Sequence, residues 1–146
     1  MKVLIQRVKK AKVTVKDETK GQIDTGILVF IGIGQNDSEK EISYLIDKIT
    51  NLRIFENESK KMDLSLKDIN GELLVISQFT LYGNTNKGRR PDFTEAANPE
   101  IAKDLYEKFI SECKNLGIKT QSGVFGAMMD IELINDGPVT FMIESK

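Results

Sequence analysis

The sequence predicts an α+β fold in which antiparallel-rich β-sheets pack in layers, like a sandwich or a barrel, with two main helices packed outside. Two unbroken apolar runs, Gly26–Gly34 and Leu73–Ile76, are typical of strands buried on both faces. Two longer segments, which begin near Ser38 and Asn98, instead repeat apolar residues at helical spacing. The 146 residues suit one domain, residues 1–146, that is long enough to bury a substantial core.

Composition limits the classes of function. The formal net charge is −1, so a contact with RNA would have to come from a local basic patch and not from a field over the whole molecule. Apolar residues make up 40% and charged residues 29% of the chain, an ordinary balance for a soluble protein. No apolar run reaches membrane-spanning length, and the first residues lack the apolar core of a signal peptide. We therefore expect a cytoplasmic protein without a membrane partner.

The chain lacks histidine and has one cysteine, Cys113. This excludes a Ser-His-Asp triad, a Cys-His pair, His-ligated zinc, a thiolate cluster and an intrachain disulfide, so we expect neither a metal nor another cofactor. Cys113 lies in an apolar helical stripe and is expected to be a packing residue. A hydrolase built from this chain must therefore use backbone dipoles, hydroxyls, carboxylates, lysines or the substrate itself.

The first part of the chain is expected to form an antiparallel meander. Lys2–Val8 and Ala11–Lys16 are predicted to be two strands, and turn residues at Asp17–Gly21 lead to a third short segment, Gln22–Asp24. Arg7 ends the first strand close to several lysines. A solvated, charged edge is favoured for it over an inward hydrogen-bonding role.

The two predicted helices have clear start signals. Ser38 and Glu41 match a capping box, and Asn98 precedes a proline at the first helical position. The first apolar stripe is Ile42, Leu45, Ile46, Ile49 and Leu52. The second stripe, which ends before Gly117, is Ile101, Leu105, Phe109, Cys113 and Leu116. Between the helices we expect a short strand at Leu52–Phe55 and one helical turn around Met62–Leu66.

The buried strand Leu73–Ile76 ends in polar residues. Ser77, Gln78, Phe79 and Thr80 place hydroxyls, an amide and backbone N–H groups that soon lose their partners at the edge of the core. Small-molecule sites are commonly built from such groups at the mouth of an apolar pocket. From this stretch alone, however, a core strand whose polar end enters a loop remains the better interpretation.

Asn84–Asn98 is the longest irregular segment, and a loop of this length in a compact domain is more often functional than not. It contains three cations within four residues, Lys87, Arg89 and Arg90. Because they follow the end of the buried strand, they could meet phosphates. A solvated loop is the alternative, and the charge run alone does not decide between them.

The remainder of the chain is predicted to be rich in strands, at Ile118–Gln121, Ala127–Asn135 and Val139–Glu144. Asp136-Gly137 is a strong hairpin signal between the last two. Pro138 follows at once, although proline removes a ladder donor where a strand should begin. It either defines the start of the strand or marks one of the few places where a cis peptide is tolerated.

Together, these segments resemble a D-aminoacyl-tRNA deacylase of the bacterial and eukaryotic type. The resemblance is carried by MKVLIQRVKKAKVTV, SQFTLYG, GRRPDFTEAANPEIAKDLYEKF, GVFGAMMDIEL and NDGPVTFMIES, in family order over essentially the whole chain. Met128 departs from it, because an acidic residue is expected there, and so does the polar loop after Phe55.

The resemblance implies a homodimer that hydrolyses the ester between a D-amino acid and the terminal ribose of tRNA, with glycine mischarged on tRNA as a second substrate. It implies that Ser77–Thr80 form the pocket floor. Gly137 and Pro138 would form a Gly-cisPro pair that enters the partner's pocket and excludes L-amino acids, while Arg7 helps to hold the pair. Phe125 and Met129 would line the adenosine site.

An aminoacyl ester is already activated, so attack by water needs only orientation and stabilisation of the oxyanion. The preferred mechanism uses the backbone N–H groups of Phe79 and Thr80, assisted by the ribose 2′-hydroxyl. Thr80 Oγ as nucleophile ranks second, because no histidine can activate it. Two other functions stay open. A small-molecule esterase would leave the cations at 87–90 unexplained, and a non-catalytic RNA-binding module would leave the Ser77–Thr80 mouth unexplained.

Overall fold

One continuous strand, β1 (Lys2–Val15), occupies the first part of the chain in the computed structural model, which describes residues 1–145. Its first half packs Val3 and Ile5 against the helices, whereas Val8 and the residues after it face a second core. The two separate strands predicted here are therefore wrong. The chain stays extended through the exposed Lys9, and the two halves of β1 bury their side chains in different cores.

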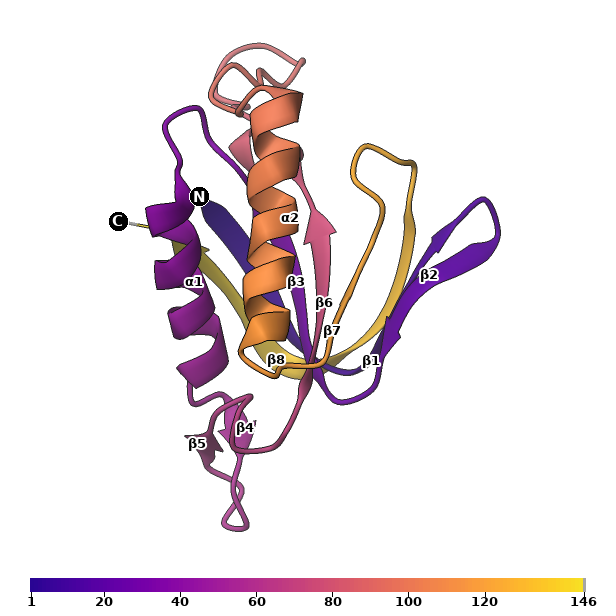
Figure 1. The fold of residues 1–146 in the computed structure, drawn as a ribbon, viewed down its shortest axis with the longest axis vertical. Coiled ribbons are helices and arrows are strands. Elements are labelled where there is room, and N and C mark those ends of the chain that lie inside the picture. Colours follow the sequence, from indigo (N-terminus) through magenta and orange to yellow (C-terminus); the bar gives the residue numbers. More distant parts are fainter. Residues whose placement is uncertain (146) are drawn as a thin grey trace.

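A mixed six-stranded sheet is built around β1, in the order β2-β1-β3-β6-β7, with β8 also paired to β1 (Figure 1). Strands β2, β3 and β8 run antiparallel to β1, but β6 runs parallel to both β3 and β7. The expectation of antiparallel-rich layers is thus not confirmed, since the strand that leads to the predicted site has parallel neighbours on both sides. The bounds are β2 (Glu18–Ile23), β3 (Gly26–Gly32), β6 (Glu72–Ser77), β7 (Thr120–Ser122) and β8 (Asp130–Glu144).

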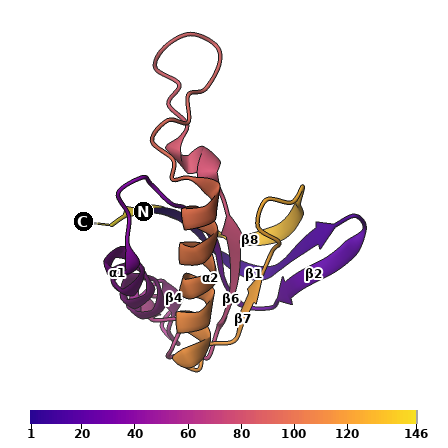
Figure 2. The ribbon, with the colours of Figure 1, turned by 45° about the horizontal axis from the view of Figure 1, so that its top comes forward.

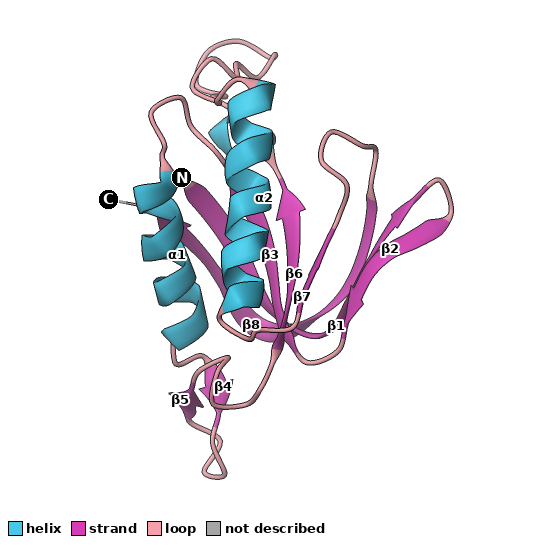
Figure 3. Cartoon of the chain, in the orientation of Figure 1, coloured by secondary structure: helices cyan, strands magenta, loops and turns pink. Residues whose placement is uncertain are grey.

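The sheet curls until it is nearly a closed barrel (Figure 3). Gly21 in β2 lies so close to β7 that a Cβ atom on it would be 2.9 Å from the carbonyl oxygen of Ser122. The inside of this curl is the second core, made of Val8, Ala11, Val13, Ile23, Leu28, Leu74 and Ile76. Because β6 contributes to both cores, its side chains are buried on both faces, as its apolar run predicts.

Helices α1 (Glu39–Asn51) and α2 (Pro99–Asn115) lie side by side on the outer face of the sheet (Figure 1). The predicted capping box at Ser38 and the Asn98 cap are both present. Ile101 and Leu116, however, are 52% and 57% exposed, so their predicted burial is wrong. Ile101 is at the start of the i+4 row, which turns by about 40° around the helix at each step and so leaves the buried face. Leu116 lies one residue beyond the end of α2. Neither helix, nor any other in residues 1–145, is long and apolar enough to cross a membrane.

The segment between α1 and β6 forms a small hairpin from β4 (Phe55–Glu56) and β5 (Met62–Leu64). Of the predicted strand Leu52–Phe55, only Phe55 belongs to a strand. The helical turn expected around Met62–Leu66 is wrong, because β5 begins there. The side chain of Asn57 explains the hairpin, because its Oδ1 accepts from the N–H groups of Ser59 and Lys61 at 2.9 and 3.1 Å.

The predicted hairpin at Asp136-Gly137 does not form. Strand β8 continues through this turn and pairs with β1 on both sides of it, with Asn135 opposite Val8 and Thr140 opposite Gln6. Residues 136–139 therefore bulge out opposite Arg7 alone. The bulge is closed by Asn135 Nδ2, which donates to the carbonyl oxygens of Arg7 and Val139 at 3.1 and 3.2 Å.

Candidate active site

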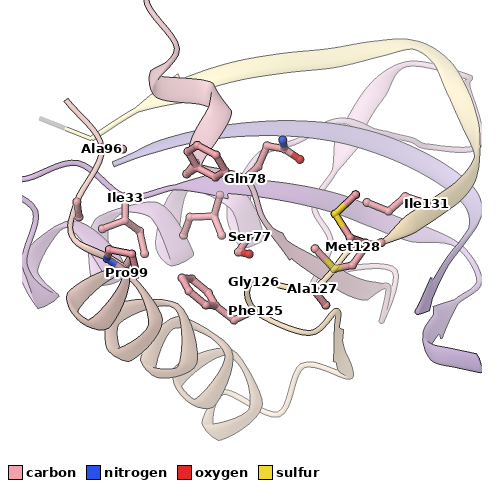
Figure 4. A pocket seen from close by; sticks show the side chains of 15 residues that line it. Ile33, Ser77, Gln78, Ala96, Pro99, Phe125, Gly126, Ala127, Met128 and Ile131 are labelled. Carbon is pink, nitrogen blue, oxygen red and sulfur yellow. The ribbon is translucent and has the colours of Figure 1, made fainter. Parts of the chain in front are cut away.

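A cavity of about 520 Å³ opens where β6 ends, between the start of α2 and the segment that leads into β8 (Figure 4). Ser77 and Gln78, both half-buried, contribute its polar groups. Its walls are mainly apolar and include Ile31, Ile33, Ala97, Ala102, Phe125 and Met129. An apolar pocket with polar groups at one end suits a ligand that carries an aromatic or aliphatic body and a reactive polar group.

The polar end of the cavity is formed where the chain leaves the sheet. Gln78 N–H donates to Ile31 O at 2.7 Å, and the chain then turns into a short 3₁₀ helix, η1 (Phe79–Tyr82). Phe79 and Thr80 are the first two residues of this 3₁₀ helix, so their N–H groups have no acceptor inside it. The strand end therefore offers backbone donors beside Ser77 and Gln78.

The four residues of the predicted site are not equally placed. Ser77, Gln78 and Phe79 line the cavity, whereas its lining within residues 1–145 does not include Thr80. Thr80 is exposed, and its Oγ1 accepts a hydrogen bond from the side-chain amide of Gln78. Phe79 is 58% exposed and packs edge-on against Phe93 of the long loop, with ring centroids 5.0 Å apart.

Phe125 and Met129 also line the cavity. Phe125 packs against Tyr106 of α2, with ring centroids 5.8 Å apart, and the Tyr106 hydroxyl donates to Val75 O at 2.8 Å. Burial raises the pKa of Tyr106 to about 12, so this hydroxyl keeps its proton and remains a donor even above pH 10. Tyr106 thus fastens β6 and Phe125 to the same helix.

Sequence reasoning missed Tyr106 and the small residues of the cavity. The signal for the tyrosine is its position next to Leu105 in a buried helical stripe, where a hydroxyl needs a partner. The signal for the small residues is the run Ala96-Ala97 before the cap of α2, which leaves space beside Ile33.

Arg7 is buried, with 3% of its surface exposed, and points inward. Its Nε donates to the carbonyl oxygen of Asp136 at 3.1 Å and its Nη1 to that of Ile54 at 2.6 Å. The solvated edge role favoured from the sequence is therefore wrong, and the inward hydrogen-bonding role is confirmed. The charge is balanced by the Asp136 carboxylate, 3.1 Å from Nε.

Gly137 and Pro138 are exposed at the tip of the bulge that Arg7 holds. The peptide bond between them is cis. They do not belong to the lining that residues 1–145 give to the cavity of their own chain. The structure therefore does not bring this pair together with Ser77 and Gln78 within one chain.

Lys87, Arg89 and Arg90 are exposed on a loop that projects beyond η1 (Figure 2). Asn84 and Asp92 close the loop at its base by two backbone hydrogen bonds of 2.8 and 3.0 Å. The cations therefore stand apart from the cavity, on the side of the molecule where β6 ends.

Residues 1–145 contain no group of three or more His, Cys, Asp and Glu side chains that could hold a metal ion. Cys113 is fully buried in the core under the helices, so its prediction as a packing residue is confirmed. The polar groups available at the cavity are thus hydroxyls, an amide and backbone donors.

Comparison with known proteins shows which family the chain resembles over its length. The family model of D-Tyr-tRNA(Tyr) deacylase matches residues 4–144. D-aminoacyl-tRNA deacylases of Thermosipho africanus and Halalkalibacterium halodurans are each 56% identical over 146 residues, all of this chain and 98% and 100% of those proteins.

Two solved structures share the fold. The c-Myc DNA unwinding element binding protein is 41% identical, with a TM-score of 0.93 over 100% of this chain and 99% of that one. A probable eukaryotic D-amino acid tRNA deacylase is 17% identical and shows the fold alone, with a TM-score of 0.85 over 97% of both chains. From the family match and the identities over the full length, the chain belongs to the D-Tyr-tRNA(Tyr) deacylase family.

Proposed function

We propose that this chain hydrolyses the ester bond between a D-amino acid and tRNA in the cavity at the end of β6, and that glycine mischarged on tRNA is a second substrate. The observation that carries the proposal is the placement of Ser77, Gln78 and Phe79 at one end of an apolar cavity. The apolar walls around Phe125 and Met129 suit the terminal adenosine, and the polar end suits the ester. Such a reaction places the protein in the cytoplasm, where tRNA is charged.

The proposed reaction is direct attack by water on the ester carbonyl. The N–H groups of Phe79 and Thr80 stabilise the oxyanion, and the ribose oxygen leaves with a proton when the tetrahedral intermediate collapses. The ribose 2′-hydroxyl assists the proton transfer. Direct attack by water is preferred to attack by Thr80 Oγ1. The hydrogen bond that Oγ1 accepts from Gln78 supports this preference, because an oxygen that accepts a hydrogen bond is a weaker nucleophile.

Selectivity for D-amino acids is proposed to come from a homodimer. Gly137 and Pro138 of one subunit enter the cavity of the other, where their carbonyl oxygens accept from the substrate's α-amino group. A D-amino acid held in this way directs its side chain outward, whereas an L-amino acid drives its side chain into rigid backbone. Glycine has no side chain and passes.

Three observations support a partner on this face. Gly137 and Pro138 are exposed, and Arg7 holds the backbone directly before them. Within residues 1–145, β8 pairs only with β1, which leaves its other edge free. This strand also exposes three apolar side chains, those of Ile134, Phe141 and Met142.

The test is the rate at which amino acids are released from D-aminoacyl-tRNA, glycyl-tRNA and L-aminoacyl-tRNA. We expect release from the first two and none above background from the third. Equal release of D- and L-amino acids would refute the steric gate. Hydrolysis of small esters without hydrolysis of any aminoacyl-tRNA would refute the substrate.

Mixing two inactive variants tests whether the gate acts across the dimer. Ala102→Phe fills the cavity, and Gly137→Ala alters the tip of the bulge. A mixed dimer then has one intact cavity faced by one intact bulge, so we expect about a quarter of the wild-type rate after random exchange of subunits. If the bulge serves its own chain, mixing restores nothing.

A further inference from the structure

A buried ion pair lies beside the proposed active site and outside its cavity. The carboxylate of Asp37 accepts from the α-amino group of Met1 at 2.5 Å through Oδ1. Its Oδ2 accepts from Gly34 N–H at 2.6 Å and from the Tyr82 hydroxyl at 3.3 Å. The amino group is fully buried, and 12% of the Asp37 side chain is exposed. Three separate parts of the chain therefore meet at one carboxylate.

Tyr82 is the last residue of η1, and its ring is fitted closely against β3 and the residues after it. A Cβ atom on Gly34 would lie 2.6 Å from the Tyr82 hydroxyl oxygen, and one on Gly32 would lie 3.2 Å from its ring. The ammonium of Lys2 stands 4.7 Å from the ring centroid. Burial and the charge of Asp37 raise the pKa of Tyr82 above its ordinary range, so the hydroxyl keeps its proton and donates.

The turn η1 depends on its two ends. All four of its residues keep part of their surface exposed, so burial in the core does not hold it. A 3₁₀ turn of this length has little stability of its own. One end is held by Gln78 N–H on Ile31 O and by Phe79 against Phe93. The other end is held by the Tyr82 ring against Gly32 and Gly34, and by the Tyr82 hydroxyl on Asp37.

We propose that Asp37 is a positioning residue of the deacylase. By holding Tyr82, it fixes the orientation of η1, and with it the N–H groups of Phe79 and Thr80 at the other end of the same turn. Oxyanion stabilisation depends on placing donors within a fraction of an ångström, so a turn fixed at one end only loses part of it. The inference rests on the proposed function, in which these two N–H groups act on the substrate.

Two near-isosteric variants test the proposal. Asp37→Asn removes the charge that faces Met1, and Tyr82→Phe removes only the hydroxyl that reaches Asp37. We expect kcat for D-aminoacyl-tRNA to fall about tenfold in the first and less in the second, the range for weakened hydrogen bonds to a charged group. KM should stay within about twofold, because neither residue lines the substrate cavity.

Glu95→Gln is the matched control. Glu95 lies with Asp37 and Tyr82 around a second, smaller cavity, and its side chain makes no hydrogen bond or ion pair within residues 1–145. Its removal changes the local charge and leaves the contacts of Asp37 intact. We expect its kcat to match that of the wild type.

The amide signals of Phe79 and Thr80 in ¹⁵N-labelled protein give a readout that a merely structural role would not move. We expect both to shift in Asp37→Asn and Tyr82→Phe, and neither to shift in Glu95→Gln. Wild-type kcat and unmoved signals in the two variants would overturn the proposal. A change in KM alone, or a lower melting temperature with wild-type kcat, would also overturn it. If Asp37→Asn does not fold, Tyr82→Phe decides. The wild-type rate tests the proposed function separately.

Discussion

Arg7 Nε lies 3.1 Å from the carbonyl oxygen of Asp136, the residue directly before the exposed Gly137–Pro138 pair. The same guanidinium donates to Ile54 O at 2.6 Å. One side chain from the middle of β1 therefore connects the bulge of β8 to the loop that follows α1. The orientation of the bulge depends on a residue that is buried in the domain.

Replacing Arg7 with lysine should destabilise the fold and loosen the bulge. A single ammonium cannot reach both carbonyl groups in the fork geometry of a guanidinium. We expect a loss of roughly 2–3 kcal/mol in the free energy of unfolding, because a buried carbonyl loses its donor. Urea denaturation measures it. Arg53→Lys is the control, since Arg53 is 67% exposed in its ion pair with Asp63 and should change stability by less than about 0.5 kcal/mol.

The same Arg7→Lys protein should discriminate less well between D- and L-aminoacyl-tRNA, if the bulge is the gate. The ratio of the two rates of release is the measurement. If the variant is destabilised but keeps the wild-type ratio, Arg7 stabilises the fold and has no part in chiral selection.

In the proposed mechanism, backbone donors and not the hydroxyl stabilise the transition state, so Thr80→Ala should keep appreciable turnover, within about tenfold of the wild type. Chelators should leave the rate unchanged. Single-turnover release of a D-amino acid is the measurement, with tRNA binding as the check on folding. A variant that binds tRNA and has lost all hydrolysis would make Thr80 the nucleophile.

Neutralising Lys87, Arg89 and Arg90 to glutamine should weaken tRNA binding and flatten its dependence on salt. Each lost phosphate contact should lower the slope of log K against log salt by about one unit. The control replaces Lys60, Lys61 and Lys67, three exposed lysines between β4 and β6. The β4–β5 hairpin lies at the opposite end of the molecule from the loop (Figure 1). An unchanged slope in the loop variant would leave the loop without a role in phosphate binding.

Cys113 should be unreactive in the native protein. Burial raises the pKa of its thiol from the ordinary 9.0 to about 12, and the side chain is fully buried. A thiol reagent at pH 8 should label the protein quickly in urea and very slowly without it, and the treated native enzyme should stay active. Rapid native labelling would contradict the packing role.

The raised pKa of Cys113 makes the free energy of unfolding depend on pH in the alkaline range. Folding raises the pKa of this thiol, so its contribution to stability is complete below about pH 9 and is lost as the pH rises towards 12. The expected slope from this group is at most about 1.4 kcal/mol per pH unit. Cys113→Ala should show a shallower decline of unfolding free energy over this range.

The sequence predicts the features that depend only on residues close together in the chain. The capping box at Ser38, the Asn98 cap and the two-sided burial of β6 were all readable, because each depends on neighbours in the chain. The structure at Asp136-Gly137 could not be predicted in this way. The same two residues can form a hairpin turn or a bulge, and pairing with the distant strand β1 decides between them. A local pattern cannot supply a partner strand.

The candidate site divides in the same way. The polar end of β6 could be placed at a pocket mouth, because strand and breaker are adjacent in sequence. The inward role of Arg7 could not, since its partners Asp136 and Ile54 are 129 and 47 positions away. The walls of the cavity, from Ile33, Ala102 and Phe125, likewise come from three distant parts of the chain.

The pairing of β1 with β8 affects how this protein can fold. Met1 donates to Ser145, 144 positions away, and β1 is the strand to which β2, β3 and β8 all bind. Contacts this distant close late and slowly, because loop closure must precede them. During synthesis β1 must wait, with one edge unpaired, until Glu144 has left the ribosome. Because the pairing of β8 with β1 shapes the bulge, the protein cannot present the bulge to another molecule before β8 has been synthesised.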